Sequence, residues 1–111
     1  MPRMTLDHLY RETHHWEESV AWWGNLGFTF AERWGGEPHR AGRLECGGAV
    51  VVLAEVPSTA DLASSVFLAC DDVADLGMRT GASVIDTHWG TAMVSLTDPD
   101  GRSYHFEPGG A

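Results

Sequence analysis

The sequence predicts an α+β protein made of two tandem βαβββ modules. The order of strand, helix and three strands occurs twice, with a repeat of about 50 residues. Each predicted helix ends at a glycine, Gly27 in the first half and Gly81 in the second. The chain closes with a β-hairpin about the tight turn Asp98-Pro99-Asp100-Gly101. We expect one domain over residues 1–111, with module one over about residues 1–57 and module two over about 58–111.

The first module begins with a predicted strand over residues 5–12. Thr13 is a suitable N-cap for the helix that follows, and Glu17 and Glu18 fall in its first turn, where the helix dipole favours acidic side chains. The buried face of this helix is defined by residues at helical spacing, namely Trp16, Val20 and Trp23. Three more strands are expected at Phe28–Trp34, Arg40–Cys46 and Ala49–Val56.

The second module repeats this order. A strand over Ser65–Cys70 leads into a short helix that is capped by Asp72 and buries Val73 and Leu76. The strands that complete the module are expected at Ser83–Thr87, Thr91–Leu96 and Ser103–Phe106.

The amino-acid composition limits the classes of partner that the protein is expected to bind. The net charge is −9, from 16 acidic and 7 basic residues with no lysine, which argues against binding to nucleic acid. Neither an apolar run of the roughly 20 residues that span a bilayer nor a secretory signal is visible, so we expect a cytoplasmic protein that does not bind membranes. Cys46 and Cys70 are expected to be buried thiols rather than a disulfide framework. The acidity suits a cationic ligand, although solubility alone also explains it.

Three motifs, in this order and spacing, resemble the vicinal oxygen chelate superfamily, which includes glyoxalase I, extradiol dioxygenases, fosfomycin-resistance enzymes and bleomycin-resistance proteins. They are His8 eleven residues before the segment Ser19–Phe28, the strand-to-helix segment Ser65–Val73, and Trp89-Gly90 followed by Asp98–Gly101. The resemblance implies that the two modules form a curved mixed sheet around a cavity. It does not by itself imply one activity.

In metal-dependent members of this superfamily, four strand residues bind one divalent ion. The resemblance places these positions on His8, Val52, Ser65 and His105. The two histidines are competent ligands for Zn²⁺, Ni²⁺, Mn²⁺ or Fe²⁺, whereas Val52 and Ser65 are not strong donors. The metal site implied in this way is incomplete, and both histidines can also be read as buried structural residues.

The remaining candidate residues are two carboxylates and a set of cavity residues. Glu12 and Glu107 are candidate catalytic residues, each as a metal ligand or general base. Glu12 stands where glyoxalase-like proteins often carry an arginine for an anionic substrate, which favours a neutral or cationic ligand here. The candidate ligand-binding residues are Tyr10, Trp34, Val52, Ser65, Phe67 and Trp89. For the two tryptophans, packing at strand ends is the simpler alternative.

These features leave more than one function open. The first hypothesis is a protein of the resistance or sequestration type that binds a small aromatic or cationic compound. The alternative is a divalent-metal-dependent lyase, isomerase or dioxygenase that acts on a substrate with vicinal oxygens. A third reading is a pocket-bearing protein whose ligand is unrelated to either. The resemblance and the open sheet edges favour a homodimer, and whether the cavity forms within one chain or across a dimer stays open.

Overall fold

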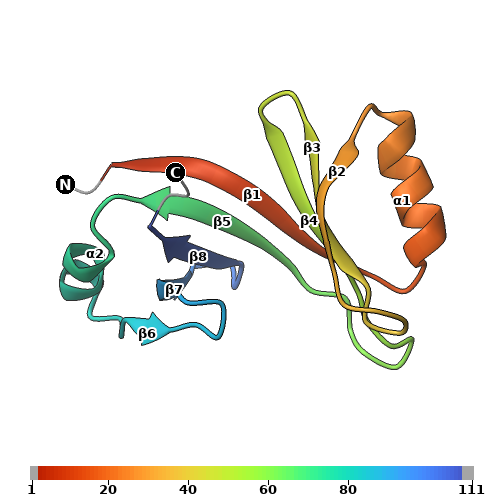
Figure 1. The fold of residues 1–111 in the computed structure, drawn as a ribbon. Coiled ribbons are helices and arrows are strands. Elements are labelled where there is room, and N and C mark those ends of the chain that lie inside the picture. Colours follow the sequence, from red (N-terminus) through yellow and green to blue (C-terminus); the bar gives the residue numbers. More distant parts are fainter. Residues whose placement is uncertain (1–2, 109–111) are drawn as a thin grey trace. The chain divides into compact units, whose positions relative to one another are not determined.

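The computed structural model describes residues 3–108. The described elements follow the predicted order and confirm the α+β class (Figure 1). They are β1 (Met4–Thr13), α1 (Trp16–Asn25), β2 (Thr29–Trp34), β3 (Ala41–Cys46), β4 (Ala49–Glu55), β5 (Ser64–Cys70), α2 (Val73–Thr80), β6 (Ile85–Asp86), β7 (Ala92–Thr97) and β8 (Ser103–Glu107). Neither helix is long and apolar enough to cross a lipid bilayer, within the part of the chain that the structure describes.

The described chain divides into two compact units. We call residues 8–64 the first unit, and residues 3–7 together with 65–108 the second unit. Each unit contains one of the two helices and a mixed sheet. The two units are described separately below.

In the first unit, the strands have the order β2-β3-β4-β1. The pairs β2/β3 and β3/β4 are antiparallel, and β1 runs parallel to β4 with Leu9 opposite Val51. The side chains of Leu44, Val51 and Leu53 alternate onto one face and are almost completely buried. The helix α1 covers this face, because its Trp16 packs against Phe30 of β2 with ring centroids 6.0 Å apart.

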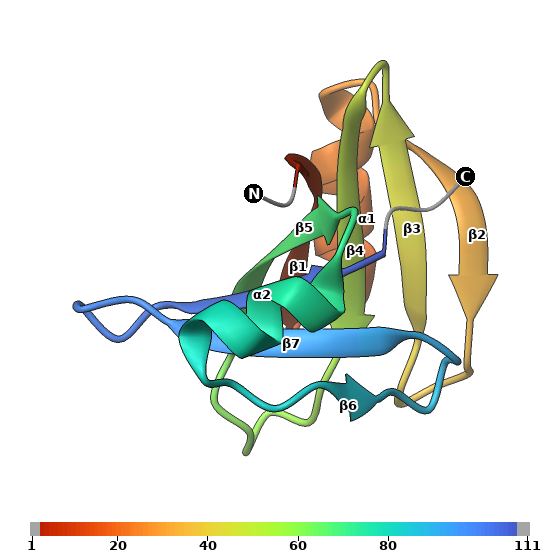
Figure 2. The same ribbon diagram turned by 90° about the vertical axis from the view of Figure 1, so that its left-hand side faces the viewer.

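In the second unit, the strands have the order β5-β8-β7-β6, with β5 parallel to β8 and the other pairs antiparallel. The helix α2 lies against β7 in Figure 2 and packs onto one face of this sheet. The core between them consists of Cys70, Val73, Leu76, Val94 and Phe106. The caps of α2 are as predicted: the Asp72 carboxylate accepts from the backbone N–H of Asp75 at 2.9 Å, and Gly81 ends the helix with a φ of 74°.

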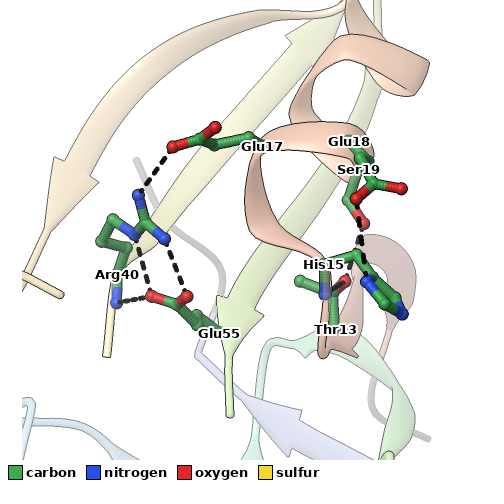
Figure 3. A network of polar contacts seen from close by, with 7 residues as sticks. All are labelled: Thr13, His15, Glu17, Glu18, Ser19, Arg40 and Glu55. Carbon is green, nitrogen blue, oxygen red and sulfur yellow. Dashed lines mark hydrogen bonds and ion pairs between the residues drawn. The ribbon is translucent and has the colours of Figure 1, made fainter. Parts of the chain in front are cut away.

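Four local predictions were wrong. The expected buried face of α1 is only half-buried, because Trp16, Val20 and Trp23 all remain partly exposed. Thr13 is not the N-cap of α1, because its hydroxyl contacts the hydroxyl of Ser19 at 2.7 Å and accepts from the backbone N–H of His15, which takes the cap position (Figure 3). Cys46 is partly exposed rather than buried. The strand expected over residues 83–87 shrinks to Ile85–Asp86, because Thr87 and Thr91 bond to each other and form a turn.

An ion-pair network in the first unit connects three segments (Figure 3). The guanidinium of Arg40 donates from Nε and Nη2 to the two carboxylate oxygens of Glu55 at 2.8 Å each, while its Nη1 lies 3.6 Å from Glu17 of α1. Bidentate contacts of this kind are the strong form of the arginine–carboxylate pair. The network therefore joins the residue before β3 to the end of β4 and to the first turn of α1.

A first prediction concerns the close approach of β2 to β3 at Gly42. A Cβ atom at this position would lie 2.5 Å from a ring carbon of Phe30 and 2.8 Å from the backbone oxygen of Glu32. We expect Gly42→Ala to lower the free energy of unfolding by about 1–3 kcal/mol, the usual cost of overpacking. Urea denaturation measures this change. Gly48→Ala is the matched control, since a Cβ there meets nothing within 4 Å; equal stability of the two variants would contradict the prediction.

A second prediction concerns acid stability. The hydrogen bonds from Arg40 lower the pKa of Glu55 from 4.5 to about 2. Because the folded-state pKa is depressed, the pair stabilises the protein above about pH 4.5, and this contribution is lost as the pH falls towards 2. We expect Glu55→Gln to be less stable than the natural chain near neutral pH, with the difference shrinking across this window. Denaturation at several pH values tests it, with Glu18→Gln of the exposed α1 surface as control; a difference that does not depend on pH would contradict it.

Candidate ligand-binding faces

The residues that alternate with the core residues form a second face on each sheet, opposite the helix. In the first unit we call this the first open face. The strand registers arrange it in rows across the sheet. One row consists of Tyr10, Val52, Arg43 and Glu32, and the next consists of Glu12, Ala54, Ala41 and Trp34. Four of the predicted site residues therefore share this face.

Glu12 and Tyr10 form one polar pair on the first open face. The Tyr10 hydroxyl donates to Glu12 Oε2 at 2.8 Å, and the backbone N–H of Ala63 donates to Glu12 Oε1 at 2.8 Å. Partial burial, the hydrogen bond to Glu12 and the charge of Glu12 raise the pKa of Tyr10 to about 12. Tyr10 is thus a neutral phenol at physiological pH, and Glu12 fastens the segment before β5 to β1.

The opposite side of this face carries a second aromatic–carboxylate pair. The indole Nε1 of Trp34 donates to Glu32 Oε2 at 3.2 Å, and the Trp34 side chain is 43% exposed. Between the two pairs, the guanidinium of Arg43 is engaged by Glu45 at 2.8 Å. The first open face thus combines aromatic rings with an excess of carboxylates.

In the second unit, the second open face centres on His105. The register places Phe67 of β5, His105 of β8 and Ser95 of β7 side by side. The rings of Phe67 and His105 have centroids 4.8 Å apart, and His105 Nδ1 lies 2.7 Å from the hydroxyl of Ser95. These contacts hold the imidazole in one orientation. Ser65, two residues before Phe67 on β5, belongs to the same face by alternation.

Glu107 fastens a loop to this second open face. Its Oε2 accepts from the indole Nε1 of Trp89 at 2.6 Å and from the hydroxyl of Thr91 at 2.5 Å. The Thr91 hydroxyl also contacts the hydroxyl of Thr87 at 2.9 Å. The turn between β6 and β7 is therefore tied to β8, and it presents a Trp89 side chain that is 51% exposed.

The structure gathers the predicted site residues into two groups. The first open face contains Tyr10, Glu12, Trp34 and Val52, and the second contains Ser65, Phe67, Trp89, His105 and Glu107. His8 stands at the start of the first unit, on the β1 face of Tyr10. Sequence reasoning missed Ser95, Thr91 and Arg43. The alternation of polar Ser95 with buried Val94 is a signal that would have found the first of them.

The residues present do not make a complete metal site. Among residues 3–108, no three or more His, Cys, Asp or Glu side chains are grouped so as to hold a metal ion. Val52 and Ser65 stand at two of the four ligand positions implied by the resemblance, and neither supplies a strong donor. Both candidate carboxylates, Glu12 and Glu107, accept two hydrogen bonds each from their own unit. This donor set does not fit a tightly held divalent ion.

The Tyr10–Glu12 pair leads to a prediction. We expect Glu12→Gln to lower the pKa of Tyr10 below about 12, because the variant removes the carboxylate charge. The pKa should stay above its ordinary value of 10, since burial is the largest cause of the shift. Tyrosinate absorbance during alkaline titration measures it, in a Tyr104→Phe background that removes the other tyrosine. Glu18→Gln is the control, and an unaltered Tyr10 pKa in folded Glu12→Gln would contradict the assignment.

Comparison with known proteins gives the fold its context. No family model and no curated protein matches the sequence. Among solved structures, a glyoxalase/bleomycin resistance protein/dioxygenase superfamily member from Vibrio splendidus 12B01 is similar over 98% of this chain and 100% of its own, with a TM-score of 0.74 at 15% identity. A hypothetical protein from Bacillus halodurans C-125 is similar over 97% and 96%, with a TM-score of 0.65 at 13% identity.

A third structure is 2,2',3-trihydroxybiphenyl 1,2-dioxygenase from Sphingomonas wittichii strain RW1. It is similar over 95% of this chain but 42% of its own, with a TM-score of 0.58 at 15% identity. These likenesses agree with the motifs at His8, Ser65–Val73 and Asp98–Gly101. The chain therefore has the vicinal oxygen chelate fold of glyoxalase/bleomycin resistance/dioxygenase proteins.

Proposed function

We propose that the protein is a member of the vicinal oxygen chelate superfamily that binds a small aromatic or cationic compound on its open sheet faces, as a binding or sequestering protein. The observation that carries this proposal is the second open face. There the Phe67 and His105 rings are in contact and the exposed Trp89 is bonded to the Glu107 carboxylate. Aromatic faces beside a carboxylate attract flat and positively charged ligands by stacking and by cation–π and charge interactions.

Both candidate general bases are held by hydrogen bonds within the protein, which supports a binding function over a catalytic one. A general base must reach the proton that it removes. Glu12 is held by Tyr10 and Ala63, and Glu107 by Trp89 and Thr91. In these contacts the two carboxylates act as anchors for neighbouring segments. The aromatic rings that they hold are thereby pre-positioned for a ligand, which reduces the entropy lost on binding.

A second candidate function is a divalent-metal-dependent lyase, isomerase or dioxygenase acting on vicinal oxygens. The contact between Ser95 and His105 Nδ1 favours it. Donation from Nδ1–H would place the imidazole lone pair on Nε2, and such a second hydrogen bond is the usual support of a metal-binding histidine. His8 and His105 would be the ligands, with Glu12 or Glu107 as a further ligand or base. One divalent ion would supply Lewis-acid chemistry.

We also propose that the protein is a cytoplasmic homodimer. Support for the dimer comes from the sheet edges, since β2 and β6 are terminal strands in the strand order and so have a neighbour on one side only.

Ligand titration tests the binding proposal. We expect isothermal titration calorimetry to detect binding of acridine or its N-methyl cation, and Phe67→Ala and Trp89→Leu to weaken it about 10-fold each, a change of about 1.4 kcal/mol. Trp22→Leu is the matched control, because Trp22 is 59% exposed on α1 rather than on an open face. Binding that is equally weak in all three variants, or absent from the natural chain, would contradict the proposal.

Elemental mass spectrometry of untagged protein separates the two candidate functions. Close to one divalent ion per chain that is lost in the His8→Ala/His105→Ala double variant would favour the metal-dependent enzyme. Protein that takes up no metal after incubation with Zn²⁺, Ni²⁺, Mn²⁺ and Fe²⁺ would favour the binding protein.

A further inference from the structure

One methionine on β7 is buried without belonging to the core beneath α2. Met93 is 8% exposed, yet the cluster that α2 covers contains its neighbour Val94 and not Met93 itself. Because side chains alternate along β7, Met93 lies on the second open face together with Ser95. On that face Ser95 is exposed, and Ile85, the partner of Met93 on β6, is 48% exposed. The sheet alone therefore does not bury Met93, and a cover above the sheet is needed.

The turn between β6 and β7 is placed to provide this cover. In the antiparallel register of β7 and β8, Val94 lies opposite Phe106. One residue further along both strands, Met93 lies beside Glu107 on the second open face. The indole Nε1 of Trp89 donates to Glu107 Oε2 at 2.6 Å, which brings the Trp89 ring to the part of the face where Met93 lies.

Residues 87–91 form this turn, and we call them the strap. Thr87 and Thr91 bond to each other through their hydroxyl groups and their backbone, which closes the strap into a compact turn. Gly90 has a φ of 92°, a left-handed conformation that glycine adopts without strain, so the chain can turn back towards β7. Because these features lie within the strap, the strap can move as one piece.

Two side-chain hydrogen bonds join the strap to β8, and both end on one atom. Trp89 Nε1 and the Thr91 hydroxyl donate to Glu107 Oε2 at 2.6 and 2.5 Å. The Trp89 side chain is 51% exposed, so water can compete for these bonds. Segments held by few, solvent-accessible hydrogen bonds open locally at a lower free energy than the whole domain unfolds. The position of the cover thus depends on one carboxylate oxygen.

We propose that the strap is a gate over the part of the second open face around Met93. In the closed state Trp89 covers Met93 and is held by Glu107. In the open state both donors leave Glu107 Oε2 and Met93 is exposed to solvent, while the core beneath α2 stays folded. This inference goes beyond the proposed function, because it concerns a movement of the chain itself and needs no ligand.

Oxidation of the methionines tests this inference on the intact protein. Hydrogen peroxide converts an accessible methionine into its sulfoxide, and mass spectrometry of peptides gives the rate at each position. Met78 is 86% exposed and is the reference for full access, so Met93 should be oxidised more slowly than Met78 in the natural chain. Alkylation of Cys70 by iodoacetamide in a parallel sample reports unfolding of the whole core, because Cys70 is 1% exposed beneath α2.

Two variants loosen the strap and leave its aromatic ring in place. Trp89→Phe removes the Nε1 donor, and Glu107→Gln keeps the size of the acceptor side chain but removes its charge. We expect each variant to speed the oxidation of Met93 about 5–10-fold, because a hydrogen bond to a charged group is lost or weakened. The rates at Met78 and Cys70 should not change.

Trp34→Phe is the matched control. The indole Nε1 of Trp34 also donates to a glutamate, Glu32 at 3.2 Å, but this pair belongs to the first unit. The control variant should therefore leave the oxidation rate of Met93 unchanged. Circular dichroism and thermal unfolding establish that each variant is folded.

Three outcomes would overturn this inference. If Met93 is oxidised at the natural rate in both folded variants, Glu107 does not hold a gate. If oxidation of Met93 and alkylation of Cys70 rise together, the exposure comes from unfolding of the core. If Trp34→Phe acts as strongly as Trp89→Phe, the effect is not local to the strap. None of these measurements includes a ligand, so the proposed function stands or fails separately, in the titration with acridine.

Discussion

In each unit, a single helix buries one face of the sheet, and the positions of all other side chains follow from this arrangement. Val94 in the second unit is completely buried beneath α2, together with Phe106 on the neighbouring strand. Because side chains alternate, His105 and Ser95 must point to the opposite face. A slip of β8 by one residue would expose Phe106 and bury His105, so the register that protects the core also positions the site.

The open faces owe their local order to carboxylates rather than to a second hydrophobic layer. Glu12 holds the segment before β5, and Glu107 holds the turn before β7, in both cases together with an aromatic donor. A hydrogen bond to a charged group is worth about 1.5–3 kcal/mol, enough to keep a half-exposed ring in place. Such rings have little freedom left to lose, so a ligand that stacked on them would bind at a lower cost in entropy.

The fold could be predicted from the sequence because its signals are local. Alternation defines the strands, and Asp72 and Gly81 mark the ends of α2 as expected. Thr13 failed as a predicted cap because its hydroxyl bonds both the backbone N–H of His15 and the hydroxyl of Ser19, and the helix begins after His15 instead. The types of residue on the open faces could be predicted in the same way. Their partners could not, since the contact between Glu12 and Ala63 joins residues 51 positions apart.

The same strand position can coordinate a metal ion or contact an organic ligand, and the type of side chain there determines which. A divalent ion needs several strong donors at once, so replacing even two of four weakens its site severely. Val52 supplies apolar surface beside Tyr10, and Glu12 brings negative charge to the same face. Both side chains act in one direction, because apolar surface and carboxylates favour a ring with a positive charge over an anion. The open faces thus present aromatic rings and hydrogen-bonded carboxylates on the geometry of this fold.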